Sequence, residues 1–273
     1  MIHGDDHDDF GGLQRDLRAT GTAIDRRGLF RMAARLGLGM SAFQILGCSS
    51  DSPTSPDTIT SGGVNSTCSR IPSETAGPFP GDGSNGPSVL SSIGVVRSDI
   101  TSSFAGLSGT AEGVPLTIAL TIVAATTCSA LAGRAVYLWQ CDREGRYSLY
   151  SSGVTNQNYL RGVQEADADG KVTFRSIYPG CYSGRWPHIH FEVYPNLASA
   201  TSVANKVATS QIALPKATSD LVYATPGYEQ SIGNLSRVTL ASDSVFSDGS
   251  SLQLATITGS VAGGLTATLS VAI

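Results

Sequence analysis

This sequence has few charged residues, no basic excess and no closely spaced cysteines. Only 15% of its 273 residues are charged, and 22 acidic against 18 basic side chains give a formal net charge of -4. This balance provides no basic stripe and argues against nucleic acid as a partner. The five cysteines include no C-x-x-C pair, so a metal site made of cysteines alone is not expected. The chain is long enough for one ordinary globular domain with extra segments.

The N-terminal region resembles an export signal followed by a tether. Arg26 and Arg27 precede an apolar run at 36–46 that is too short to span a bilayer and ends in ILGC at Cys48. The pattern resembles a bacterial twin-arginine signal with a lipobox. It implies removal of residues 1–47, lipidation of Cys48 and an exported protein anchored to the extracytoplasmic side of a bacterial membrane. The alternative is an amphipathic helix with chance arginines.

The signal is followed by a tether and then by a folded part that contains four further cysteines. Residues 48–67 are polar and rich in Ser, Thr, Pro and Gly, which predicts a flexible tether. An even number of cysteines in an exported chain indicates up to two disulfides, with three possible pairings. The four residues are Cys68, Cys128, Cys141 and Cys181.

Residues 68–273 are predicted to form one all-β domain. Apolar side chains alternate along 116–123 and again along 265–273, as expected for strands with one buried face. Further strand-like runs occur at 134–140, 171–177 and 188–194, separated by turn residues. No segment after residue 70 shows a 3.6-residue stripe over three turns. The expected architecture is a β-sandwich of mainly antiparallel strands with long active-site loops.

The two histidines of the sequence WPHIHF are the first candidates for chemistry. On a strand His188 and His190 project from the same face, about 6.5 Å apart at Cα, with Ile189 on the core side. Such a pair can bind one metal ion; the alternative is an exposed pair with no ligand. Glu192 continues the face, but it is about 13 Å from His188 along an extended strand, too far for a third ligand.

Other donors lie in nearby turns. Tyr147 follows the DREG turn and Tyr182 follows a Pro-Gly turn. A phenol has a pKa near 10 and needs a strongly Lewis-acidic ion such as Fe(III) to be ionised at neutral pH. Ordinary packing is the alternative for each tyrosine. Asp142 and the aspartates at 167 and 169 lie in turn-like contexts and are interpreted as surface residues.

The order of these motifs resembles that of the intradiol ring-cleavage dioxygenases. The matching runs are VYLWQCDREGRYS, LRGVQEADADGKVTFRSIYPGCYSGRWPHIHFEV and ETAGPF. The last element makes the match closest to the secreted, protocatechuate 3,4-dioxygenase beta-like branch. The resemblance extends from about residue 68 to the C-terminus and implies a mononuclear non-haem Fe(III) held by four ligands: Tyr147, Tyr182, His188 and His190.

The resemblance also implies roles for the residues around the metal. Tyr182 would be the axial ligand that leaves and acts as a base when substrate binds. Arg185 would stabilise charge on the bound ring, and Gln211 matches a catalytic pocket glutamine. Phe79 and Trp139 are expected at the substrate pocket, although Trp139 in a strand is equally consistent with core packing.

The implied reaction is cleavage of a catechol-type ring between its two hydroxylated carbons by O2, giving a cis,cis-muconate-type diacid. Two other functions fit parts of the sequence. One is a non-catalytic transthyretin-like surface module that binds polyphenol or glycan, and the other is a zinc or Fe(II) enzyme that uses the two histidines and a carboxylate. The sequence does not identify which catechol is the substrate.

The chain departs from the family at two cysteines. Cys181 stands where an aromatic residue often precedes the axial tyrosine, and Cys141 stands where a small residue is common. A Cys141–Cys181 bridge near the metal, with Cys68–Cys128 as its complement, is therefore one expected pairing. The helical dimerisation region of the catechol 1,2-type enzymes is not found in this sequence.

Overall fold

A computed structural model describes residues 68–273 of the chain. The signal predicted at 1–47, the tether at 48–67 and the lipidation site Cys48 lie outside these residues. Within 68–273, no helix is both long and apolar enough to cross a membrane.

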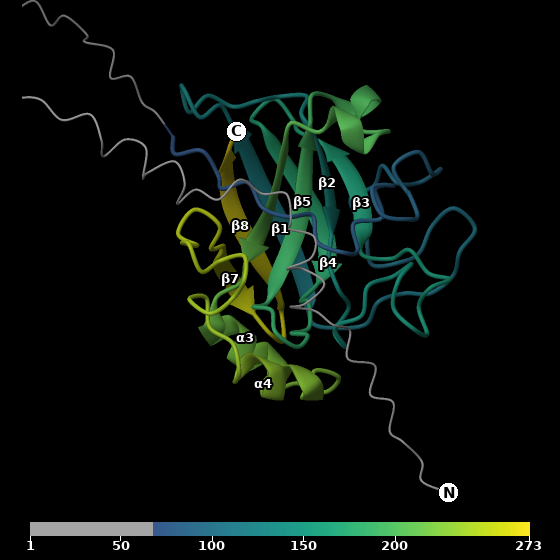
Figure 1. The fold of residues 1–273 in the computed structure, drawn as a ribbon, viewed down its shortest axis with the longest axis vertical. Helices are drawn as coiled ribbons and strands as arrows, with labels where there is room; N and C mark the ends of the chain where they lie inside the picture. The colour runs from purple at the N-terminus through teal and green to yellow at the C-terminus, as the bar shows by residue number, and fades with distance from the viewer. Residues whose placement is uncertain (1–67) are drawn as a thin grey trace, which may run out of the picture. The chain divides into compact units, whose positions relative to one another are not determined.

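The described domain is a sandwich of two four-stranded sheets (Figure 1). One sheet has the order β4-β1-β8-β7 and the other has the order β3-β2-β5-β6. The β1–β8 pair is parallel and the other strand pairs are antiparallel, which confirms the predicted all-β sandwich. The strands are β1 Pro115–Val123, β2 Ala135–Trp139, β3 Arg161–Glu165, β4 Lys171–Ile177, β5 His188–Tyr194, β6 Ala208–Ala213, β7 Thr256–Ser260 and β8 Gly264–Ala272.

Apolar side chains between the two sheets form the main core. On β1 the alternation predicted from sequence is confirmed, because the residues at 116, 118, 120 and 122 are all buried. They pack in one cluster with Val136 and Leu138 of β2 and with Ile189 and Phe191 of β5. Burial of each such side chain contributes about 1.5–3 kcal/mol. This packing fixes which face of β5 points away from the core.

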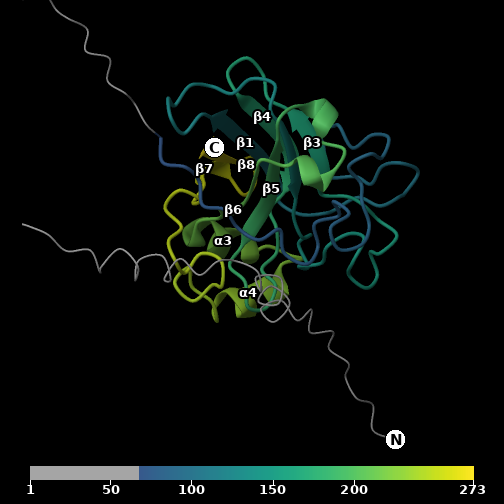
Figure 2. The same cartoon turned by 45° about the horizontal axis from the view of Figure 1, so that its top comes forward.

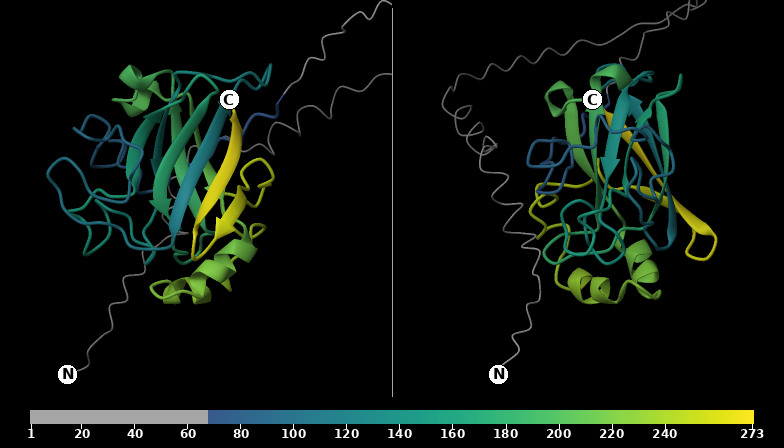
Figure 3. Two further views of the ribbon diagram at one scale, coloured as in Figure 1. Left: turned by 180° about the vertical axis from the view of Figure 1, so that it is seen from behind. Right: turned by 90° about the vertical axis from the view of Figure 1, so that its right-hand side faces the viewer.

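Short helices occupy the connections after β5 and β6. The 3-10 helices η1 (Leu197–Ser199) and η2 (Val203–Asn205) precede β6, and α3 (Lys216–Tyr223) and α4 (Glu229–Leu235) follow it. Helices α3 and α4 have eight and seven residues, about two turns each, so neither produces the three-turn stripe sought in the sequence. They lie together at one end of the sandwich (Figures 2 and 3).

A disulfide and backbone hydrogen bonds join the two ends of the described domain. Cys68 is bonded to Cys128, and the Cys68 amide donates to the carbonyl of Ala125. The Ala125 amide in turn donates to the carbonyl of Ile273, and the Ile71 amide donates to the carbonyl of Ala272. The start and the end of the domain therefore meet at the same end of the sandwich.

The Cys68–Cys128 bond is expected to stabilise the domain strongly, because it closes a loop with a sequence separation of 60 residues. Loss of a bond that closes such a loop costs about 4 kcal/mol in the chain-entropy model. A variant with serine at both positions should lose about this much unfolding free energy in urea denaturation. A reducing agent should destabilise the wild type and leave the variant unchanged; an equal response of both proteins would contradict the prediction.

Candidate metal centre

The outer face of the β3-β2-β5-β6 sheet is covered by loops. A second buried cluster lies there, made of Tyr137 and Trp139 from β2 and of Phe79, Tyr147 and Tyr182 from the loops. Strands β2 and β5 are therefore buried along their whole length. Polar groups on this face are shielded from bulk water, which strengthens their electrostatic interactions.

Strand β5 presents His188 and His190 on this loop-covered face. Ile189 between them points into the core, so the two-residue period places both imidazoles together. Their Nε2 atoms are 3.1 Å apart. The Nδ1 atom of His188 contacts the carbonyl oxygen of Trp186, which assigns the proton to Nδ1 and leaves the lone pair on Nε2.

Tyr147 follows a tight turn built around Asp142. The Oδ1 atom of Asp142 accepts hydrogen bonds from the amides of Glu144 and Arg146, and its Oδ2 atom accepts from the hydroxyl of Tyr159 at 2.8 Å. Gly145 closes the turn with φ at +83°, a conformation that favours glycine. Asp142 is buried, so its interpretation as a surface residue was wrong. Its carboxylate is directed inward because it satisfies the amides of the turn.

The Pro-Gly turn brings Tyr182 beside the first turn. The Gly180 amide donates to the carbonyl of Asp142 at 2.9 Å, and a Cβ on Gly180 would lie 2.5 Å from the carbonyl oxygen of Arg143. Only glycine allows this approach. Ser231 and Asn234 of α4 bind the backbone of Cys181, so α4 supports the loop that carries Tyr182.

The hydroxyls of both tyrosines meet the two imidazoles at one point. His188 Nε2 lies 3.2 Å from the Tyr182 hydroxyl and 3.4 Å from the Tyr147 hydroxyl. His190 Nε2 lies 3.2 Å from the Tyr147 hydroxyl. One lone pair on His188 Nε2 cannot satisfy all its polar neighbours by hydrogen bonds. Donors that are each about 2.1 Å from a shared ion lie about 3 to 3.4 Å apart, so these four atoms fit a metal ion.

The donor types also fit a highly charged cation. Within residues 68–273 no group of three or more His, Cys, Asp and Glu side chains is arranged to hold a metal, so the tyrosines are essential to this site. Burial raises the pKa of Tyr147 well above 10, and a strong Lewis acid is needed to ionise it at neutral pH. Burial and the charge of Arg185 lower the pKa of His188 well below 6.5. The imidazole is therefore neutral and able to coordinate.

The metal-free protein should lose stability in mild acid. Burial, followed by the interaction with the neighbouring His188 and by the charge of Arg185, also lowers the pKa of His190 well below 6.5. Below pH 6.5 the unfolded chain thus binds protons that the folded chain does not, so stability is present above pH 6.5 and falls as the pH drops below it. Between pH 7.5 and 5.5 the unfolding free energy should fall by about 2–3 kcal/mol in chelator-treated protein. His190→Gln should show about half of this dependence, and a flat profile in the wild type would contradict the expectation.

Arg185 lies beside the four donors and is fully buried. Its Nη1 is 3.5 Å from His188 Nε2, its Nη2 donates to Gln211 Oε1 at 2.7 Å, and its Nε donates to Asp243 Oδ2 at 3.0 Å. Gln211, on β6, is paired in register with His190 and donates to the carbonyl of Thr75. The guanidinium is therefore held in one orientation next to the candidate metal ligands.

The predicted pocket residues Phe79 and Trp139 contact the donors from two sides. The Phe79 ring lies 4.9 Å from the Tyr147 ring, centroid to centroid. Trp139 stacks on His190 at 4.9 Å with an interplanar angle of 6°. Trp139 therefore orients a candidate ligand directly, beyond the core packing that was the alternative for this residue.

Glu192, which the sequence analysis excluded as a ligand, and the two remaining cysteines lie near the centre but do not contribute donors to it. Glu192 binds Lys206 at 2.8 Å and Tyr194 at 2.7 Å, and so is engaged away from the donors. The predicted Cys141–Cys181 bridge is absent: both thiols are buried and free. The Cys141 thiol contacts the carbonyl of Gly180 and the Cys181 thiol that of Arg185, so each sulfur has its own acceptor.

Two buried charged residues near the centre were not predicted from the sequence. Asp243 holds Arg185 from a position 58 residues away, and Arg161 binds the carbonyl of Phe79 across 82 residues. Neither lies in a short motif with the residue it holds. A buried guanidinium such as that of Arg185 requires a carboxylate partner, and this partner is supplied by packing of distant segments and not by a local motif.

Comparisons with known proteins agree on one family. Residues 86–195 match the model of a family described as dioxygenase. The structure is similar to an intradiol ring-cleavage dioxygenase from Tetranychus urticae, with 27% identity, a TM-score of 0.54, and coverage of 66% of this chain and 86% of that chain. It is also similar to a second solved dioxygenase, with 26% identity, a TM-score of 0.60, and coverage of 76% and 94%. No curated protein matches the sequence.

Proposed function

The chain belongs to the intradiol ring-cleavage dioxygenases, and from this we propose that it is an Fe(III) enzyme that cleaves a catechol-type ring with O2. Cleavage takes place between the two hydroxylated carbons and gives a cis,cis-muconate-type diacid. The observation that carries the proposal is the meeting of two phenol oxygens and two imidazole nitrogens at separations of 3.1–3.4 Å. The secreted, protocatechuate 3,4-dioxygenase beta-like branch of the family stays a prediction.

Tyr147, Tyr182, His188 and His190 would hold the ion. When bound, Fe(III) supplies the Lewis acidity that favours ionised phenols and a catechol bound as its dianion. The two neutral imidazoles contribute no charge, so the two anionic tyrosines would offset two of the three positive charges of the cation. The aromatic side chains that bury the donors exclude water from the site and preserve the strength of these charge interactions.

Tyr182 would accept a proton from the substrate. Its hydroxyl lies 3.2 Å from His188 Nε2. It is carried by a loop, whereas the histidines are fixed in β5. A phenolate oxygen that takes up a phenolic proton of the catechol would serve first as a ligand and then as a base.

Arg185 would stabilise negative charge on the bound ring. Its Nη2 and Nε donate to Gln211 and Asp243, and its Nη1 lies 3.5 Å from His188 Nε2, beside the donors. A guanidinium whose orientation is already fixed before the reaction needs little reorganisation as negative charge develops on the ring. Such preorganised groups usually make the largest single contribution to catalysis. Gln211 fixes the orientation of Arg185 and, through Thr75, links it to the segment that carries Phe79.

Iron analysis and oxygen uptake test this function directly. The purified protein should contain about one iron per chain, absorb visible light through tyrosinate-to-iron charge transfer and consume O2 with a member of a catechol, hydroxyquinol and protocatechuate panel. Binding of polyphenol or glycan without O2 uptake would indicate the transthyretin-like binding module instead. Stoichiometric zinc in a colourless protein would overturn the proposal.

We also propose that the protein is exported and anchored through lipidated Cys48. Two features support this: the signal-like pattern at residues 26–48, and the Cys68–Cys128 disulfide, a bond typical of exported proteins. Expression of the full chain should place the protein in the membrane fraction, and Cys48→Ala should release it. An equal distribution of both proteins would contradict this proposal.

A further inference from the structure

Arg161 of β3 is a buried cation held by neutral groups. Its side chain is fully buried, and its hydrogen-bond acceptors among residues 68–273 are three carbonyl oxygens and the hydroxyls of Ser148 and Tyr137. The guanidinium carbon also lies 5.5 Å from the centre of the Tyr150 ring. An arginine remains charged in proteins, and burying a charge without an opposite charge is costly. A residue that only filled this volume would be apolar, so the guanidinium must serve its contacts.

These contacts join two loop segments that are far apart in sequence. Nη2 donates both to the carbonyl of Phe79 at 3.0 Å and to the carbonyl of Ser148 at 2.9 Å. Nη1 donates to the carbonyl of Pro80 at 2.7 Å, and Nε donates to the hydroxyl of Ser148 at 3.1 Å. One planar group therefore fixes the distance between the segment of Phe79 and the segment that follows Tyr147.

The two segments are fitted closely around this guanidinium. Gly81 has φ at +65°, and a Cβ at this position would lie 2.7 Å from Arg161 Nη1. The Gly81 amide donates to the hydroxyl of Tyr150, whose ring packs on Phe79. A shift of the guanidinium would therefore move the Phe79 backbone, and with it the ring that faces Tyr147.

We propose that Arg161 is a positioning residue that acts through Phe79 to set how closely a substrate ring can fit beside Tyr147. The inference rests on the proposed function, because it takes a catechol-type ring as the substrate that binds there. The guanidinium of Arg161 carries five N–H donors in a planar fork, so it can donate to the carbonyls of both segments at the same time. A lysine side chain has a single nitrogen, so it would keep the charge but not this geometry.

The test is Arg161→Lys in the iron-loaded protein, with iron content, visible spectrum, KM and kcat measured for the best catechol. The expected result is a rise in KM of about tenfold, with kcat changed by less than about twofold, because binding is lost without loss of the reacting groups. Iron content and spectrum should equal those of the wild type. Arg97→Lys is the matched control: Arg97 also donates to carbonyls, those of Arg161 and Ser102, but not to the segment of Phe79, and KM should not change.

A double-variant cycle shows whether the effect passes through Phe79. In a Phe79→Leu background, Arg161→Lys should raise KM by less than about twofold, since coupled residues are not additive. A full tenfold rise in that background would overturn the proposal, as would an unchanged KM in the single variant. A purely structural role would lower stability in both variants and leave KM unchanged.

Two further cases have to be distinguished: a variant that does not fold and a wild type that is inactive. If Arg161→Lys does not fold, Tyr137→Phe replaces it: the Tyr137 hydroxyl donates to the carbonyl of Pro80 at 2.7 Å, and its loss should raise KM about threefold. An unchanged KM in Tyr137→Phe would then overturn the proposal. A wild-type protein that turns over no catechol would overturn the proposed function itself, whereas an active wild type with insensitive variants overturns only the role of Arg161.

Discussion

Tyr147→Phe should remove most of the visible absorption of the iron-loaded protein and reduce ring cleavage by more than about a hundredfold. Loss of an outer partner of a metal ligand already costs about 10–100-fold in affinity or activity, and a lost ligand should cost more. The substitution removes only the oxygen that lies 3.2–3.4 Å from His188 and His190. The ring that packs on Phe79 is retained, so the fold should persist.

The matched control for this prediction is Tyr178→Phe. Tyr178 is also a fully buried phenol, but it belongs to the main core cluster and bonds Ser219 of α3. Its removal should reduce stability by about 1 kcal/mol and leave the spectrum unchanged. Absorption and oxygen uptake that survive in Tyr147→Phe would show that the metal, if bound, is held elsewhere.

Asp243→Ala should lower the unfolding free energy by about 3–5 kcal/mol, the usual cost of removing one partner of a buried ion pair. Both side chains of the Arg185–Asp243 pair have zero exposure. The same carboxylate accepts from the amides of Trp186, Val245 and Phe246, which would lose their acceptor. Oxygen uptake should fall as well, because Arg185 loses the partner that fixes its Nε.

Asp220→Ala provides the comparison for this result. Asp220 pairs with Lys216 at 2.7 Å, but both side chains are more than half exposed, and such pairs contribute about 1 kcal/mol or less. Urea denaturation at the same pH measures the difference in unfolding free energy between the two variants. Similar losses for Asp243→Ala and Asp220→Ala would show that the buried pair contributes little.

The sequence was most informative where one face of a strand is buried and the other is exposed. Strands β1 and β8 could be located from their alternation for this reason. Strands β3, β6 and β7 were missed: β3 and β6 carry buried polar residues such as Arg161 and Gln211, and β7 is largely exposed. A polar residue buried in a strand removes the contrast on which alternation depends.

Local sequence patterns also identified only part of the metal centre. The pair His188 and His190 could be found from spacing, because both ligands lie on one strand. The two tyrosines come from separate turns, and only the resemblance to a family connected them to the histidines. Asp243 and Arg161 act through contacts across 58 and 82 residues. No local pattern encodes such contacts, which depend on the packing of loops against the β3-β2-β5-β6 sheet.

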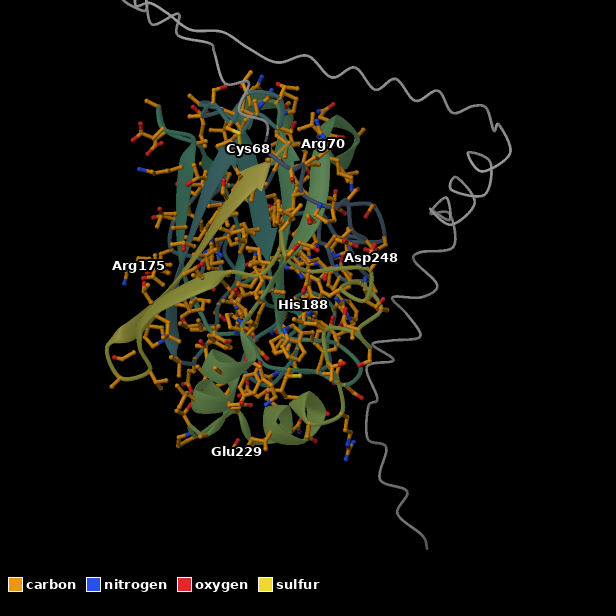
Figure 4. The ribbon with its side chains drawn as sticks, turned by 90° about the vertical axis from the view of Figure 1, so that its left-hand side faces the viewer. Cys68, Arg70, Arg175, His188, Glu229 and Asp248 are labelled. Atoms are coloured by element: carbon orange, nitrogen blue, oxygen red, sulfur yellow. A yellow bond between two sulfur atoms is a disulfide. The ribbon has the colours of Figure 1, made fainter. Side chains whose placement is uncertain are left out.

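The meeting of the first and last residues of the domain at one end of the sandwich has a practical consequence. Cys68 lies at the end of the sandwich away from His188 (Figure 4), and the backbone bonds of Ala125 and Ile71 bring residues 272 and 273 to the same end. Closely spaced ends favour circular permutation. A short linker from residue 273 to residue 68, with new termini in the turn between β7 and β8, would therefore leave every proposed iron ligand within an uninterrupted stretch of chain.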